Sequence, residues 1–248
     1  MTRLAVRPPE YIPRPSTLAL WLAADRVVLG DTFPVSRQSP QTRAGIRSSE
    51  GTGQERLWLS VPLRGVTRGR TPIREAAVGR QAPWQRTHLR AIDTCYRAAP
   101  YFEHYYPKVR AILEGPSDTL AEYAVAFCVW MMLEISGNEH LGYASSSPGA
   151  PHTLAGVVAA EAASGAVEVL ALAESARHEA GRLREAGIDV PVWVVDFDEA
   201  PRRQSFEGFV PGLCALDLLM HYGPASAEVL RAGTRVVRLD DWLSMGTS

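Results

Sequence analysis

Two side chains in this sequence of 248 residues combine the chemistry of a general base with a suitable local setting. Asp31 ends the Gly30-Asp31 pair that follows the segment Arg26–Leu29, which we predict to be a buried strand. A carboxylate at a strand end can accept a proton or orient a ligand hydroxyl or amine, although an aspartate after Gly30 also suits a structural turn. His88 follows Trp84 by about one helical turn. It could act as a neutral base or donate to an anion, and an ordinary histidine on a helix surface would fit the same sequence.

Basic side chains are concentrated in the first part of the chain. Residues 1–97 carry 16 basic and 7 acidic side chains, whereas residues 98–248 carry 10 and 20, and the net charge is −1. An arginine-rich segment can attract a phosphate, carboxylate or nucleotide, because guanidinium groups bind planar anions well. We predict that Arg7, Arg43 and Arg86 hold an anionic substrate. The alternative is that the two parts of the chain pair their charges where they meet.

Three further side chains are expected to bind the substrate, namely Tyr11, Ser146 and Gln204. Ser146 lies in a run of three serines whose hydroxyl and amide groups could hold an anion beside a helix start, although such runs commonly form an ordinary loop. Asp217 interrupts an apolar run, where burial of a carboxylate is costly without a donor. We expect Asp217 to pair with an arginine or to accept from backbone amides, with a functional role as the alternative.

Highly specific catalytic motifs are missing from this sequence. It contains no GxGxxG, no Walker loop, no GxSxG and no HExxH. No histidine has ligand spacing with another histidine or with cysteine, so no metal is expected. Cys95 shares a predicted helix with His88 but lies ~10 Å further along its axis, too far for a nucleophilic pair. Together with Cys128 and Cys214 it forms neither a disulfide framework nor a zinc site, and we expect a cytoplasmic protein.

The order of the apolar runs predicts an α/β fold. Expected strands lie at 4–6, 26–29, 57–63, 143–144, 167–172 and 190–195, and expected helices at 17–24, 84–98, 102–113, 118–137, 153–163, 175–186, 211–222 and 224–232. Residues 34–56 are expected to form one long loop. Strands separated by helices favour a parallel sheet. We therefore predict one domain, 1–248, with a mostly parallel Rossmann-like sheet flanked by helices and a helical insertion at about 84–137.

The predicted sheet also indicates where a ligand would bind. In open sheets of this kind, ligands lie beyond the carboxyl ends of the strands. That edge comprises residues 7–11, 30–31, 64–74, 144–147, 173–175 and 196. The sequence therefore predicts a pocket that draws its polar groups from these segments.

Several segments in this order resemble the WbqC-like protein family, a group of bacterial proteins found with polysaccharide and other biosynthetic genes. The segments are Arg7–Pro13, Ala24–Asp31, Arg43 with Trp58–Pro62, Trp84–His88, Cys95–Phe102, Phe206–Leu213, Asp217–Leu219 and Gly223–Pro224. They span essentially the whole chain, and their combined order is specific although each piece alone is short. The resemblance implies a biosynthetic role.

The sequence departs from the family pattern at several positions. The family's opening His-Gln pair is Arg7-Pro8 here, and the first residue of its Asp-Asp pair is Gly30. An expected Ser-Gly-rich turn after the strand at 167–172 is replaced by Ala173–Ser175, and an expected asparagine is Cys95. These departures imply a different substrate or loss of the ancestral reaction.

We predict a biosynthetic transferase that joins an acyl or aminoacyl group to an amine or hydroxyl in bacterial polysaccharide or secondary-metabolite biosynthesis. No bound cofactor is expected, and a donor linked to CoA, a nucleotide or a tRNA would be a co-substrate. One alternative is a tailoring cyclase or lyase that acts on a carboxylated metabolite. Another is a non-catalytic binding partner in a biosynthetic complex.

The expected partner is a small anionic substrate. Self-association into a homo-oligomer stays open, as does a transient tRNA contact through residues 64–97. A net charge near zero argues against DNA binding. No run of about 18 uncharged apolar residues is present, which argues against a membrane span.

Overall fold

The computed structural model describes residues 1–48, 55–67, 69–80, 83–137 and 141–245, and it is built around a six-stranded sheet. The strands are β1 (Thr2–Arg7), β2 (Arg26–Leu29), β5 (Gly142–Tyr143), β6 (Val167–Leu172), β7 (Val192–Phe197) and β8 (Thr234–Arg238). Their spatial order is β5-β2-β1-β6-β7-β8, and only the β7–β8 pair is antiparallel. The predicted mostly parallel α/β sheet is confirmed. This is the strand order of a Rossmann-type sheet, in which the direction of winding reverses between β1 and β6.

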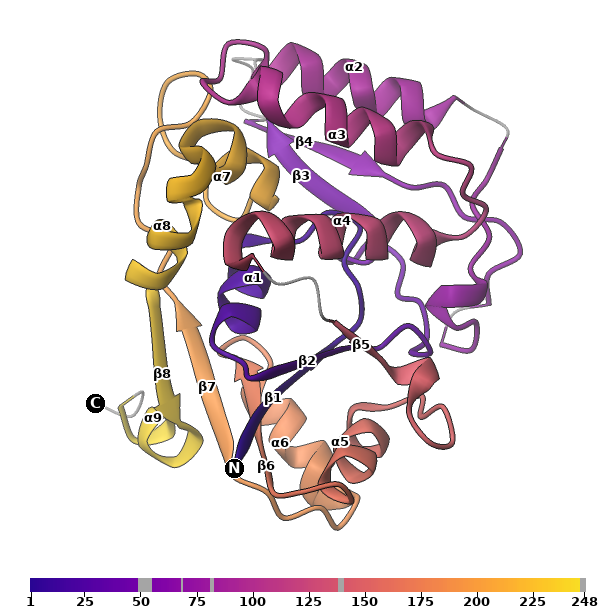
Figure 1. Cartoon of the computed structure of the whole chain (residues 1–248), viewed down its shortest axis with the longest axis vertical. Helices are drawn as coiled ribbons and strands as arrows, with labels where there is room; N and C mark the ends of the chain where they lie inside the picture. Colours follow the sequence, from indigo (N-terminus) through magenta and orange to yellow (C-terminus); the bar gives the residue numbers. More distant parts are fainter. Residues whose placement is uncertain (49–54, 68, 81–82, 138–140, 246–248) are drawn as a thin grey trace.

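Helices cover both faces of this sheet (Figure 1). One face is covered by α1 (Pro15–Leu22), α4 (Leu120–Ser136), α7 (Ala215–Tyr222) and α8 (Ser226–Ala232). The other face is covered by α5 (Leu154–Ala162), α6 (Ala176–Glu185) and α9 (Leu239–Met245). The central strand β1 has buried side chains on both faces, as a covered parallel strand requires. Ala5 belongs to the large core on one face, whereas Leu4 and Val6 belong to a second core on the other.

The structure also contains a second, two-stranded sheet, of which only the later strand was expected. Strand β3 (Arg43–Arg47) pairs antiparallel with β4 (Arg56–Ser60), so the prediction of one long loop at 34–56 is wrong in its middle. Residues 49–54, also within that prediction, lie outside the described residues. Figure 1 shows this hairpin beside α2 (Trp84–Tyr96) and α3 (Phe102–Glu114), on the far side of α4 from the main sheet. Helices α2, α3 and α4 follow one another without an intervening strand, as the sequence indicated.

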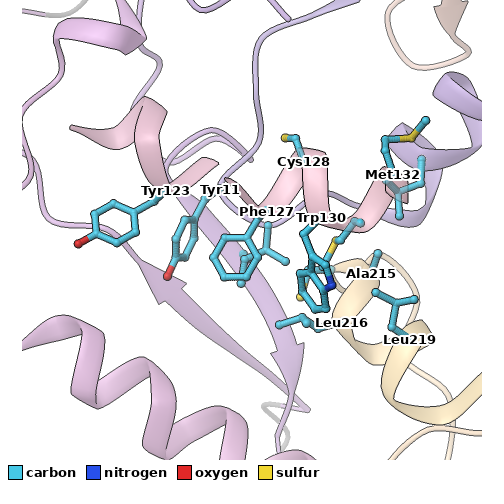
Figure 2. Close-up of a cluster of buried hydrophobic side chains, with 14 of the residues drawn as sticks. Tyr11, Tyr123, Phe127, Cys128, Trp130, Met132, Ala215, Leu216 and Leu219 are labelled. Atoms are coloured by element: carbon cyan, nitrogen blue, oxygen red, sulfur yellow. The ribbon is translucent and has the colours of Figure 1, made fainter. Parts of the chain in front are cut away.

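Helix α4 is central because nearly all of its faces are apolar. It begins at a capping box in which Thr119 and Glu122 satisfy each other's backbone N–H groups, and it ends at Gly137, whose φ is 69°. Its side chains, among them Phe127 and Trp130, pack between Tyr11 and helix α7 (Figure 2). Each large apolar side chain buried in this way contributes roughly 1.5–3 kcal/mol to stability. Among the described residues, no helix combines the length and apolar character needed to cross a membrane.

Candidate functional site

The structure brings His88 and Tyr11 together inside the core. The Tyr11 hydroxyl lies 2.8 Å from His88 Nδ1, and the Trp84 ring and the imidazole pack in a T-shaped arrangement. His88 is 4% exposed and Tyr11 is fully buried. Burial lowers the pKa of His88 to about 4, and a hydrogen bond with the Ser60 backbone opposes this shift only in part. At neutral pH the imidazole is therefore uncharged and has very little surface through which it could touch a substrate.

Asp31 has a structural partner at the carboxyl end of β2. Its Oδ1 accepts a hydrogen bond of 2.9 Å from the backbone N–H of Ser145, in the 3₁₀ turn Ala144–Ser146 that follows β5. The carboxylate thereby ties the ends of two neighbouring strands together. Ser146, in the same turn, is exposed and lines a hollow of about 590 Å³ with Tyr143.

Arg7 lies at the reversal point of the sheet, at the carboxyl end of β1. Its Nη1 donates to Glu179 Oε1 at 2.8 Å and to Ser175 Oγ at 3.1 Å. Burial raises the pKa of Glu179, and the Arg7 guanidinium opposes that rise. The charge of Arg7 is therefore largely neutralised by a carboxylate of the protein itself. Among the described residues, Glu179 Oε2 is buried and has no hydrogen-bond partner.

Further ion pairs join the basic first part of the chain to its acidic remainder. The pairs are Arg3–Glu168, Arg14–Glu174, Arg26–Glu161 and Arg80–Asp118, in addition to that of Arg7. Arg14 also binds Glu10 of its own segment. The charge asymmetry thus serves at least in part to pair the two parts of the chain, which is the alternative that the sequence left open.

Arg43 occupies a different environment, at the start of β3. Its guanidinium lies 4.2 Å from the centre of the Trp58 ring, and the side chain lines a hollow of about 330 Å³. The lining consists of Arg37, Gln38, Thr42, Arg43, Ser60, Val61 and Leu63. Within the part of the chain that the structure describes, neither Arg37 nor Arg43 has a carboxylate partner.

The three predicted anion-binding arginines do not share a common contact. Arg7 contacts α6, Arg43 contacts Trp58 of β4, and Arg86 is exposed on α2. Arg43 lines a hollow, and no described carboxylate neutralises its guanidinium.

Gln204 and Asp217 belong to one buried polar network. The Gln204 side chain donates to Asp217 Oδ2 at 3.0 Å, and it exchanges two hydrogen bonds with the backbone of Val210. Asp217 is fully buried, and Arg202 Nη2 lies 3.6 Å from its Oδ2, so the predicted pairing with an arginine is confirmed. Burial raises the pKa of Asp217, and His221 and Arg202 act against that rise. Arg202 also lines a hollow of about 780 Å³ at the carboxyl end of β7, where the predicted rim residue Asp196 lies.

Two side chains of this network were not singled out from the sequence. His221 Nδ1 lies 2.8 Å from the backbone oxygen of Asp217 and 3.9 Å from its Oδ1, and His221 Nε2 lies 3.3 Å from Ser205 Oγ. The spacing of four residues between Asp217 and His221 places both on one side of α7, and this spacing is the signal that could have found the pair. Ser205 lies in a loop without periodicity, so no local sequence pattern indicates that it contacts His221.

The cysteines lie in the core rather than at a reactive surface. Cys95, Cys128 and Cys214 are all buried and unbridged. Burial raises the pKa of Cys214 to about 12 and also raises that of Cys128. Among the described residues, no group of three or more His, Cys, Asp and Glu side chains is arranged to hold a metal ion.

Comparison with known proteins identifies the family to which the chain belongs. Residues 8–229 match the WbqC-like protein family. The uncharacterized protein Rv1507c of Mycobacterium tuberculosis (strain ATCC 25618 / H37Rv) is 25% identical over 237 residues, which cover 93% of this chain and 98% of that protein. No solved structure matches the chain. Because the family match spans most of the sequence, the resemblance carried by the separate motifs is confirmed, and the chain belongs to the WbqC-like protein family.

Proposed function

We propose that this protein is a biosynthetic transferase that joins an acyl or aminoacyl group to an amine or hydroxyl, and that the anionic part of its donor binds beside Arg43. One observation carries the proposal. Two arginines and, among the described residues, no carboxylate line the hollow of about 330 Å³ at the start of β3. An arginine that the protein itself leaves without a counter-ion is suited to a phosphate or carboxylate of a ligand.

Trp58 supports the same assignment because it positions the arginine. The indole is 44% exposed, and the Arg43 guanidinium stacks over it at 4.2 Å. A cation–π contact of this kind restricts the guanidinium without neutralising its charge. The volume of the hollow lies at the lower end of the range of small-molecule sites, so it suits the charged group of a donor rather than an entire CoA or nucleotide-linked molecule.

Binding measurements test the donor site directly. Isothermal titration with CoA, a nucleoside triphosphate and inorganic phosphate should give binding that Arg43→Gln weakens at least ~10-fold, since a charge-assisted hydrogen bond is lost. Arg90→Gln is the matched control, because Arg90 is an exposed arginine of α2 outside the hollow. Equal affinities in the two variants, or no binding of any phosphate-bearing probe, would contradict the proposal.

The predicted catalytic roles of Asp31 and His88 are tested in the transfer reaction itself. Asp31→Asn and His88→Gln each preserve the approximate shape of the side chain while removing its capacity as a base. If either residue is the base, its variant loses transfer activity while the protein stays folded. Full activity in both variants would restrict the two residues to the structural contacts described above.

The contacts of Arg7 favour a second candidate function, that of a non-catalytic binding partner in a biosynthetic complex. Arg7 and Ser175 both stand at positions that depart from the family pattern, and they contact each other and Glu179 at the reversal point of the sheet. An internal ion pair at this place competes with any ligand that would bind there. A stable stoichiometric complex with another biosynthetic protein, together with turnover that survives every substitution in the hollow, would favour this function over the transferase.

A further inference from the structure

The loop between β7 and α7 contributes a hydroxyl to a histidine that is already held by an aspartate. We propose that Ser205 is the nucleophile of the transfer reaction, that His221 is its general base, and that Asp217 is a positioning residue for His221. This inference rests on the proposed transferase function and deepens it, because it makes the reaction proceed through an acyl group on Ser205.

The hydrogen bonds of His221 favour the protonation state that a base requires. Its Nδ1 lies 2.8 Å from the backbone oxygen of Asp217, which can only accept, so the ring proton is assigned to Nδ1. The lone pair of Nε2 then faces Ser205 Oγ at 3.3 Å. A hydroxyl donating to a neutral imidazole is the arrangement from which serine nucleophiles are activated, and such contacts shorten when substrate binds.

Asp217 supplies the negative charge beside this imidazole. Its side chain is fully buried, and Oδ1 lies 3.9 Å from His221 Nδ1 without a hydrogen-bond partner of its own among the described residues. Gln204 donates a hydrogen bond to the other oxygen, Oδ2, and Arg202 Nη2 lies 3.6 Å from it. The Tyr96 ring and the imidazole pack in a T-shaped arrangement, with ring centres 6.0 Å apart. The carboxylate is therefore fixed where it can stabilise the imidazolium that forms when Ser205 loses its proton.

Ser205 is also within reach of a ligand. Its side chain is half-buried, and the next residue, Phe206, is 46% exposed with a φ of 68°. Non-glycine residues rarely adopt this left-handed conformation, and they do so preferentially at functional sites. Arg47 Nη2 donates to the backbone oxygen of Glu207 at 2.6 Å, and Arg56 donates to that of Pro211. The loop that carries Ser205 is thereby attached to the β3–β4 hairpin.

The same hairpin connects Ser205 to the proposed donor site. Arg43 and Arg47 lie on one face of β3, four residues or ~13 Å apart. Trp58 pairs with Gly45, the residue midway between them, and so lies on that face too. A donor that binds its phosphate at Arg43 and delivers its acyl group to the loop of Ser205 therefore needs a flexible arm of at least about this length. The chemical class that we assign is an acyl thioester or ester of a phosphate-bearing carrier.

The reaction then has two balanced steps. Ser205 Oγ attacks the acyl carbonyl carbon, its proton moves to His221 Nε2, and the carrier's thiol or alcohol leaves with that proton, so that an acyl ester remains on Ser205. An acceptor amine or hydroxyl attacks this ester, and His221 takes the acceptor's proton and returns it to Ser205 Oγ. No electrons are exchanged, and the only co-reactants are the acyl donor and the acceptor.

Labelling of the intact protein tests the nucleophile without knowledge of the substrate. Incubation with a fluorophosphonate, or with p-nitrophenyl acetate, should add one group, and digestion followed by mass spectrometry should locate it on Ser205. Ser205→Ala should abolish the adduct. Ser117→Ala should retain it, because Ser117 is half-buried like Ser205 but has no histidine partner among the described residues. Loss of a general base should slow labelling of His221→Gln at least ~100-fold.

The positioning role of Asp217 has its own readout, the pH profile of labelling. Among the described residues, the titratable groups that contact His221 are Asp217 on its own helix and Tyr96 of α2. Arg202 of the preceding loop lies against Asp217 and is itself paired with Glu199. Asp217→Asn removes the negative charge, so the midpoint of the profile should move to lower pH in addition to any loss of rate. A profile with an unchanged midpoint would contradict the positioning role.

Absence of an adduct on folded protein, or labelling of Ser205→Ala at the wild-type rate, would overturn the nucleophile. The outcome is distinct from a failure of the proposed function. Transfer that depends on Arg43 but yields no acyl-Ser205 rejects the nucleophile and keeps the transferase. Labelling of Ser205 that depends on His221, without binding of any phosphate-bearing donor, keeps the nucleophile and rejects the proposed donor.

Discussion

Protonation of His88 should destabilise the folded protein in mildly acidic solution. The imidazole is 4% exposed and its pKa is lowered from the ordinary value of 6.5 to about 4 by burial. Between these two values the unfolded chain binds more protons than the folded protein. The free energy of unfolding therefore falls as the pH is lowered through this window.

The size of the effect follows from the two pKa values. The difference between the two pKa values corresponds to a loss of ~3 kcal/mol in the free energy of unfolding, and the full loss is reached only below the pKa of the folded protein. From about pH 7 to about pH 5 the histidine should remove ~2 kcal/mol of stability, because the unfolded form is then mostly protonated and the folded form mostly neutral. This loss is a large fraction of the stability of an ordinary domain, which is ~5–15 kcal/mol.

Urea denaturation of the wild type and of His88→Gln at the two pH values measures this contribution. Glutamine can still bind Tyr11 but does not titrate, so every other titrating group contributes equally to both proteins. The difference in stability between wild type and variant should therefore shrink by ~2 kcal/mol, or change sign, on going from about pH 7 to about pH 5. A difference that is the same at both pH values would refute a buried, neutral His88 and would restore it as a solvent-facing base.

Three further predictions concern packing and local structure. Gly223→Ala should lower the free energy of unfolding by ~1–3 kcal/mol, measured in urea, because φ at this residue is 53° and the added methyl group would collide with the Tyr101 ring; Gly181→Ala, in an open position of α6, should instead raise it by up to ~1 kcal/mol. Thr119→Ala should cost ~1 kcal/mol through loss of the α4 capping box, and an unchanged midpoint would contradict it. A thiol reagent should modify the three buried cysteines only as fast as the protein unfolds, and rapid reaction of the native protein would show an exposed thiol.

The main sheet could be predicted because its strands are defined by local apolar runs. The segments 26–29 and 167–172 are apolar except for one charged residue each, Arg26 and Glu168, and near-continuous apolar runs are typical of buried parallel strands. Strand β8 (Thr234–Arg238) was missed because its two valines are flanked by arginines. Backbone pairing with β7, rather than its own apolar content, makes it a strand. Strand β3 was missed for a similar reason, because its own sequence contains a glycine and two arginines. Its packing is completed by the opposite strand, whose Arg56 side chain fills the space beside Gly45.

The candidate sites depend on contacts that no local pattern contains. Arg7 and Glu179 are 172 residues apart, so the sequence could indicate a free arginine at a strand end but not the carboxylate that neutralises it. The burial of His88 likewise depends on Tyr11, which lies between β1 and α1 and is 77 residues away in the sequence. Arg43 was expected within a long loop, because its strand pairing and its hollow depend on segments that meet only in the folded hairpin.

The two ends of the main sheet limit how copies of this protein could associate. Strand β5 has only two residues, and β8 presents Arg235 and Arg238 and is covered in part by α9. A short edge and an arginine-bearing edge both offer poor templates for another chain's backbone. We therefore expect that any homo-oligomer joins through helices or through the β3–β4 hairpin, and that the sheet does not continue from one molecule into the next.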